Sequence, residues 1–302
     1  MNTSQTTPTI WFCGDTHGSL DHIEWAFQEH DKPDAVVHLG DFDLHAPLSS
    51  LLSPELAERF WWIPGNHDFD LEINYTSLFQ DPLVHRCLHG KRADLASHAI
   101  VGLGGTFKGR IWYPPEEPKF LNPSALGKSR QPLAERTAAG AIWPDMLTHL
   151  GKQRAHILVT HEAPSCHRHG FAVLDQLAND LQATLLVHGH HHQDYEDHIN
   201  GGRTRVLGVG FRGITDQRGN RVVPGTRGNQ SAPYLTAQET TCDARTQPAF
   251  RQGRRAAACT CTRARSAIGK STAASESLSG AVRGDSAALL WRRLAWLGDP
   301  GL

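Results

Sequence analysis

The stretch of sequence that decides the fold is TIWFCGDTHG, residues 9–18. Its first half is a short apolar run, and Gly14, Asp15 and His17 follow soon after it. A run of this length that is rich in aromatic and β-branched residues and ends at a glycine is typical of a strand buried on both faces. Since ligands of open α/β sheets bind beyond the carboxyl ends of the strands, the stretch predicts a ligand site at Asp15 and His17.

The same arrangement recurs further along the chain. Apolar runs lead into the motifs GDFD (40–43), GNHD (65–68), the HEAP that begins at His161, and GHHH (189–192). The runs are residues 35–39, 60–63, 157–160 and 185–188. Because neighbouring parallel strands end at the same edge of a sheet, we expect all of these motifs to meet at one place.

Helical patterns occupy the segments between the predicted strands. Residues 19–28 and 171–181 carry apolar residues at helical spacing, with Ser19 as a possible cap of the first. Ser53 and Pro54 are a good start for a helix to about residue 59. Strands that alternate with helices predict an α/β fold, with a parallel or mixed sheet covered by helices.

Three segments depart from this alternation. Residues 88–105 hold two short apolar runs joined by a polar link, which predicts a β-hairpin. Residues 112–132 are rich in Pro, Lys and Glu and predict a long loop near the site. Residues 203–209 predict the last strand of the folded part.

Composition divides the chain of 302 residues into three parts. Residues 1–8 form a polar extension, residues 9–215 the folded domain, and residues 216–302 a basic, low-complexity tail with 13 Lys or Arg against 6 Asp or Glu. The tail has few large apolar residues, so we predict that it is disordered and that its deletion leaves activity largely intact. A further hypothesis is that it is out-of-frame coding sequence, which an unbroken frame across codon 216 would contradict.

Charge and targeting features argue against several classes of protein. Residues before 216 carry 17 basic and 25 acidic residues, which argues against a broad nucleic-acid footprint, so nucleic acid is expected only as a substrate. No signal peptide and no run of membrane-spanning length is visible. Cys13, Cys87 and Cys166 show no disulfide or zinc spacing. We expect a cytoplasmic protein without membrane association, and the sequence does not indicate an oligomeric state.

The motifs supply side chains that bind divalent cations. Asp15 and His17 are two residues apart and can hold one cation from an extended turn. Asp41 has two carboxylate oxygens and can bridge two cations. The remaining candidate ligands are the amide of Asn66 and the imidazoles of His161, His190 and His192. Mixed nitrogen and oxygen ligands without thiolate suit Mn, Fe, Zn, Co or Ni.

Two such cations suit the hydrolysis of phosphate esters. Ions about 3.5 to 4 Å apart stabilise the attacking and leaving oxygens and lower the pKa of bound water toward about 7. Phosphate esters need this because their transition states carry negative charge on the non-bridging oxygens. His67 is then available to donate a proton to the leaving alkoxide, and Asp68 or Asp43 would hold it in the charged form.

The ordered motifs resemble those of the calcineurin-like metallophosphoesterase superfamily over about residues 9–215. The resemblance implies a sandwich of two mixed β-sheets flanked by helices, with the site at the strand ends. It implies one metal held by Asp15, His17, Asp41 and His192, and a second held by Asp41, Asn66, His161 and His190. His67 matches the histidine that contacts phosphate and donates the proton.

The activity implied is that of a metal-dependent phosphoesterase, or phosphatase, with phosphate esters as substrates. A hydroxide that bridges two divalent ions, with manganese favoured, would attack phosphorus directly at this dinuclear centre. The phosphoprotein phosphatase branch of the family has GDxxDRG as its second motif, whereas this chain has GDFDLH and lacks that Arg. His45, Lys108 and Arg110 are candidate replacements for this phosphate clamp.

Two alternatives remain open at the level of the sequence. The first is a phosphodiesterase that acts on cyclic nucleotides or nucleic acid. The second is a non-catalytic interaction scaffold of the same fold. Retention of His67 together with every candidate ligand argues against the scaffold, because a scaffold has no chemical need for them.

Overall fold

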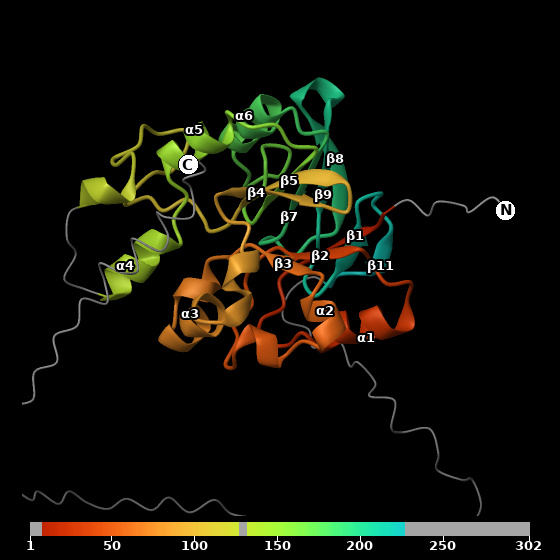
Figure 1. Cartoon of the computed structure of the whole chain (residues 1–302). Helices are drawn as coiled ribbons and strands as arrows, with labels where there is room; N and C mark the ends of the chain where they lie inside the picture. Colours follow the sequence, from red (N-terminus) through yellow and green to blue (C-terminus); the bar gives the residue numbers. More distant parts are fainter. Residues whose placement is uncertain (1–7, 127–131, 227–302) are drawn as a thin grey trace, which may run out of the picture. The chain divides into compact units, whose positions relative to one another are not determined.

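The computed structural model describes residues 8–126 and 132–226. These residues form two mixed β-sheets that stack face to face, with helices on both outer faces (Figure 1). The predicted fold class, an α/β sandwich of two mixed sheets flanked by helices, is confirmed. Over the described ranges, no helix combines the length and the apolar character needed to cross a membrane.

Each sheet contains a run of adjacent parallel strands, at one side of the first sheet and at the centre of the second. The first sheet has the order β11 (Arg221–Val223), β10 (Ile214–Asp216), β1 (Ile10–Cys13), β2 (Ala35–His38) and β3 (Phe60–Trp62). The second has the order β4 (Lys91–Leu95), β5 (His98–Leu103), β6 (Ile157–Thr160), β7 (Leu185–His188), β9 (Thr204–Gly208) and β8 (Tyr195–Ile199). Neighbouring strands are parallel in the sets β1–β2–β3 and β5–β6–β7–β9, so the carboxyl ends of each set lie at one edge of its sheet.

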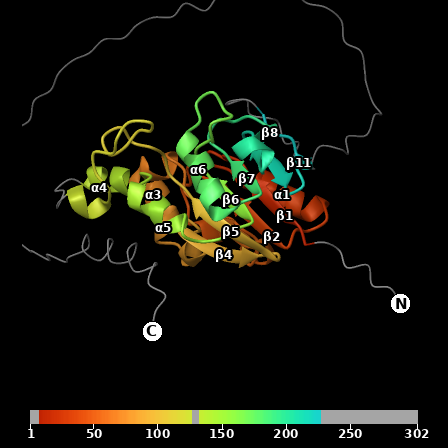
Figure 2. The ribbon, with the colours of Figure 1, turned by 90° about the horizontal axis from the view of Figure 1, so that it is seen from above.

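Helices cover the outer face of each sheet. The α-helices are α1 (Asp21–Glu29), α2 (Pro54–Ala57), α3 (Glu72–Phe79), α4 (Pro132–Ala139), α5 (Pro144–Leu150) and α6 (Ala172–Leu181). Short 3₁₀ helices are η1 (Leu48–Ser50), η2 (His67–Phe69), η3 (Pro82–Arg86), η4 (Pro123–Leu126) and η5 (Asn200–Gly202). Helices α1 and α2 pack on the first sheet, and α5 and α6 on the second, where α6 lies over β6 and β7 in Figure 2.

The structure confirms the predicted helices, but the residues at which they begin and end differ from the prediction. The first begins at Asp21, with Leu20 rather than Ser19 at the N-cap position. The second stops at Ala57, two residues before the predicted end, and Ser53 makes no capping hydrogen bond through its side chain. The predicted hairpin is β4 with β5, but its first strand is the polar segment Lys91–Leu95 rather than the run around Leu88.

Alternation along each central strand builds the core. In β1, Ile10 and Phe12 point into the layer between the sheets, whereas Trp11 and Cys13 face α1. Strands β2, β6 and β7 divide their side chains between the two layers in the same way. Burial of each large apolar side chain contributes about 1.5–3 kcal/mol. Strands that are apolar on both faces are therefore stable only in the interior of the sandwich, and this placement sets the position of the loops that follow them.

The sheet continues beyond the predicted end of the domain. β10 pairs antiparallel with β1, and β11 pairs with β10, so the boundary at residue 215 and the identification of residues 203–209 as the last strand are both wrong. Ile214 and Val223 are buried in the same core as Trp11. The turn between β10 and β11 is polar and basic, and β11 has only three residues, so the local pattern gives no sign of a strand there. The predictions for the tail from residue 227 onward and for residues 1–7 fall outside the described residues.

A chain that ends at residue 215 is expected to be less stable than one that ends at residue 234. The shorter chain lacks β11 and part of β10, which removes the buried Val223 and hydrogen bonds to β1. Loss of one buried valine costs about 2 kcal/mol, which corresponds to a fall in Tm of about 5 °C in a domain of this size. Thermal unfolding of both truncated proteins and the full chain measures this, and equal Tm values would contradict it.

Candidate metal centre

Loops at the carboxyl ends of β1, β2, β3, β6 and β7 meet at one place. They carry the predicted ligands Asp15, His17, Asp41, Asn66, His161, His190 and His192. Of these, His17, Asp41, His190 and His192 have positive φ angles, between 43° and 68°. This conformation is costly for residues other than glycine, and it persists where the surrounding structure holds it, often at functional sites.

One group of ligand atoms comes from the first and last motifs. Asp15, His17 and His192 offer atoms that all lie within 4.8 Å of one another. The Nε2 atom of His192 lies 3.1 Å from Oδ2 of Asp15 and 3.4 Å from Nε2 of His17. Two imidazole nitrogens and a fully buried carboxylate oxygen therefore converge, which is the arrangement that a single divalent cation requires.

A second group comes from the loops that follow β2, β6 and β7. Asp41, His161 and His190 again offer atoms within 4.8 Å of one another. The Nε2 atom of His161 lies 3.4 Å from Oδ2 of Asp41 and 3.3 Å from Oδ1 of Asn66, which follows β3. The structure therefore brings together all of the predicted ligands, in two groups.

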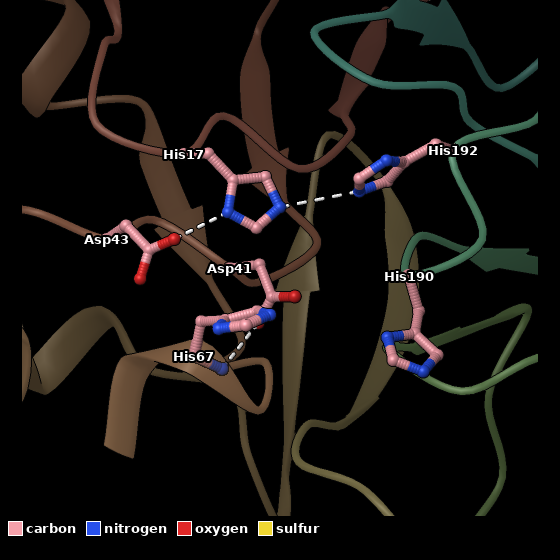
Figure 3. Close-up of a pocket in the computed structure, with 6 residues that line it drawn as sticks. All are labelled: His17, Asp41, Asp43, His67, His190 and His192. Atoms are coloured by element: carbon pink, nitrogen blue, oxygen red, sulfur yellow. Dashed lines mark hydrogen bonds and ion pairs between the residues drawn. The ribbon is translucent and has the colours of Figure 1, made fainter. Parts of the chain in front are cut away.

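Further polar groups contact the Nδ1 atoms of two of these imidazoles and so orient the rings. Oδ2 of Asp43 lies 2.5 Å from Nδ1 of His17, and the other carboxylate oxygen accepts a hydrogen bond from Nδ2 of Asn74. Figure 3 shows His17 between Asp43 on one side and His192 on the other. The carbonyl oxygen of Leu39 lies 2.7 Å from Nδ1 of His161. A partner at Nδ1 leaves Nε2 free of its proton and directed at a cation, as is common for metal-binding histidines.

Asp68 joins the loops after β2 and β3. Its carboxylate is fully buried and accepts backbone N–H groups from Asp41 at 3.0 Å, Phe42 at 2.8 Å and Gly65 at 2.8 Å. Burial, with a smaller contribution from Asp41, raises the pKa of Asp68 to about 7. The role of Asp68 is thus to hold the loop that carries Asp41, and its carboxylate faces these backbone groups rather than the ring of His67.

His67 lies at the mouth of the site and pairs with Asp70. Its Nδ1 atom lies 2.8 Å from Oδ2 of Asp70, and its backbone N–H donates to Oδ1 of Asp41. The prediction that Asp68 or Asp43 holds His67 is therefore wrong. Residues 67–69 form a 3₁₀ helix, in which residues three apart lie above one another, and this places Asp70 beside His67. In the sequence, the three-residue spacing of His67 and Asp70 in HDFD is the one feature that indicates this contact.

A cavity of about 630 Å³ opens over the two groups. It is lined by His17, Asp41, Asp43, His67, His190 and His192 (Figure 3). This lining contains no Lys or Arg. His45, Lys108 and Arg110, the candidate replacements for a phosphate clamp, do not line it, and His45 and Arg110 are exposed elsewhere.

The buried carboxylates favour positive charge between the loops. Burial lowers the pKa of His161, but the charge and hydrogen bond of Asp41, followed by Asp15, outweigh burial and raise it to about 10. Burial and the charge on His161 lower the pKa of His190 to about 3. The rings of His161 and His190 lie 4.7 Å apart, and the buried carboxylates beside them favour a positive charge at this point. The residues therefore fit a bound cation, both in donor chemistry and in charge.

For the activity that the sequence predicts, the hydrolysis of phosphate esters, Gly65→Ala is expected to lower kcat/KM by about 100-fold, because displacing a reacting group by about 1 Å has an effect of this size. A methyl group at Gly65 would lie 2.5 Å from the backbone nitrogen of Asp41 and 2.6 Å from Cε1 of His161. Both ligands would have to move. Gly109→Ala is the matched control, since its added methyl group has no neighbour within 4 Å. Equal kinetic constants for the two variants would contradict the expectation.

Comparison with known proteins identifies the family. The model of the calcineurin-like phosphoesterase family matches residues 8–194. The chain therefore belongs to this family, whose chemistry is the hydrolysis of phosphate esters and whose members bind divalent metals. An uncharacterized protein of Haemophilus influenzae is 35% identical over 226 residues, which cover 70% of this chain and 95% of that protein.

Solved structures from other organisms are also similar to this chain. A crystal structure from Thermus thermophilus is 18% identical, with a TM-score of 0.44, and the match covers 72% of this chain and 100% of that one. A protein serine/threonine phosphatase from Saccharomyces cerevisiae is 14% identical, with a TM-score of 0.33, over 71% of this chain and 74% of that one.

Proposed function

We propose that this protein hydrolyses phosphate esters at a dinuclear metal centre, with manganese as the favoured ion. The observation that carries the proposal is that two separate groups of ligand atoms lie under one open cavity. Asp15, His17 and His192 would hold one ion, and Asp41, His161 and His190, with Asn66, would hold the other. Asp41 has two carboxylate oxygens and would also bind the first ion. When bound, the ions would supply the Lewis acidity that activates water and neutralises the phosphate.

The side chains of the protein account for the remaining steps. Asp43 and the carbonyl of Leu39 fix the rings of His17 and His161, so that the ligands need little rearrangement during the reaction. His67 donates a proton to the leaving oxygen, since it lines the cavity and is held by Asp70 at its Nδ1 atom. Attack on phosphorus requires no covalent intermediate with the protein in this scheme.

The lining of the cavity favours diesters as a second candidate substrate class. A monoester carries two negative charges and a diester one. Among the described residues that line the cavity there is no Lys or Arg to balance the additional charge, and Asp43 adds a negative one. A phosphodiesterase, which the sequence leaves open as an alternative, therefore has specific support from the structure.

Aryl phosphate monoesters and diesters with the same leaving group test both parts of the proposal. Purified protein treated with EDTA is expected to lose activity, and Mn²⁺ is expected to restore it. The ratio of kcat/KM for the two esters then decides between the substrate classes. Absence of turnover on either ester and on nucleotides, in protein loaded with Mn²⁺, would contradict the proposal and favour the scaffold.

A further inference from the structure

A third group of metal-binding side chains lies next to the two described above. Glu162, His190 and His191 offer ligand atoms that all lie within 4.8 Å of one another. We propose that these residues form a third divalent cation site, which shares His190 with the second group. The number of ions expected rests on the proposed function, which accounts for the other two.

Glu162 is a buried carboxylate that forms no ion pair with a Lys or Arg of the described residues. Only 5% of it is exposed, and its Oε1 atom accepts a hydrogen bond from the backbone N–H of Phe107 at 3.2 Å. Its Oε2 atom lies 3.8 Å from Nε2 of His190. In the part of the chain that the structure describes, no Lys or Arg nitrogen lies within 4.0 Å of this carboxylate. Burying an unpaired carboxylate is costly, and a bound cation would remove that cost.

His191 supplies a ring nitrogen that makes no hydrogen bond among the described residues. Its Nε2 atom is buried and has no hydrogen-bond partner among the described residues. Buried polar atoms are nearly always paired, so an orphaned imidazole nitrogen next to a buried carboxylate indicates a missing ligand. The ring is held in place by stacking on His167, with centroids 4.1 Å apart, and by the backbone bond from its N–H to the carbonyl of Gly189.

His190 connects this group to the second one. An imidazole has two ring nitrogens, and each can bind an ion once the remaining N–H proton has been lost to solvent, so His190 would serve two neighbouring ions as an imidazolate. Two nitrogens and one carboxylate oxygen suit Mn, Zn, Co or Ni, and water can complete the coordination. His190 also lines the cavity. A third cation would therefore add positive charge beside a lining that has neither Lys nor Arg.

Counting bound Mn²⁺ on the full chain tests the site independently of activity. Equilibrium dialysis followed by mass-spectrometric metal analysis is expected to give three ions per chain for the wild type. Glu162→Gln and His191→Gln are each expected to bind two. Glu162→Gln keeps an oxygen for the N–H of Phe107, and His198→Gln, at an exposed position on β8, is the matched control and should bind three. Unfolding temperatures of the variants identify any loss that comes from unfolding.

Four other ion counts would each contradict the third site, and each has a different meaning for the two-metal centre. Two ions in the wild type would remove the third site and leave the two-metal centre intact. Three ions in both Glu162→Gln and His191→Gln would show that other residues hold the third ion. A fall from two ions to one in these variants would make Glu162 and His191 supports of the second ion. A wild type without bound metal would contradict both this site and the proposed function.

Discussion

Asp41→Asn is expected to lower kcat/KM for phosphate esters by on the order of 10³-fold or more, equivalent to about 4 kcal/mol. Asp41 is buried, and its oxygens lie toward both His161 and the backbone N–H of His67. Asparagine has the same size and can still accept the hydrogen bond from His67, but it lacks the charge. The substitution therefore removes the attraction for a cation and little else.

Steady-state kinetics and metal analysis of the same preparation measure this effect. The number of bound Mn²⁺ ions should fall together with the activity. Asp94→Asn is the control, because Asp94 is exposed on β4 and pairs with Arg92 at the surface, where ion pairs contribute little. Full activity of Asp41→Asn with an unchanged metal content would show that the two-metal interpretation of this site is mistaken.

His67→Gln is expected to have an effect that depends on the leaving group. General acid catalysis contributes about 10² to 10⁴-fold, and the benefit is greatest when the leaving oxygen is strongly basic. Alkyl phosphates should therefore lose kcat by about 10² to 10⁴-fold, whereas nitrophenyl phosphates, whose leaving groups need no proton, should lose about 10-fold or less. The slope of log kcat against leaving-group pKa should become steeper in the variant.

Asp70→Asn provides a second measure of the same step. Asp70 contacts Nδ1 of His67 and lies outside the cavity lining, so it acts as a positioning residue. We expect its loss to follow the leaving-group pattern of His67→Gln at a smaller size, about 10-fold for alkyl esters. Equal losses for alkyl and nitrophenyl esters in His67→Gln would exclude proton donation as the role of this histidine.

The central strands and the ligand types were predictable from local sequence. Runs such as residues 9–13 and 185–188 are apolar at every or nearly every position, which is typical of a strand buried on both faces. The end of the domain was not predictable in the same way. β10 and β11 are short and carry polar residues, and they are recognisable as strands only because β1 supplies a partner for β10.

The contacts of the candidate site residues could be identified only from the tertiary structure. Asp43 lies two residues after Asp41 in the sequence, yet it contacts His17 from another loop. Asp70 reaches His67 because of a local 3₁₀ turn, which the sequence pattern indicated only weakly. Glu162 directly follows His161, but its position beside His190 and His191 depends on how β6 and β7 pair.

The sequence by itself determined which side chains are candidate ligands, because ligand type is a property of single residues and each motif directly follows its own strand. The tertiary structure alone decided which candidate ligands lie close enough to share an ion, which carboxylate orients which imidazole, and where the sheet ends. The physical reason is that these are contacts between residues far apart in the chain. Their distances are set by the pairing of strands and the packing of two sheets, which no local pattern encodes.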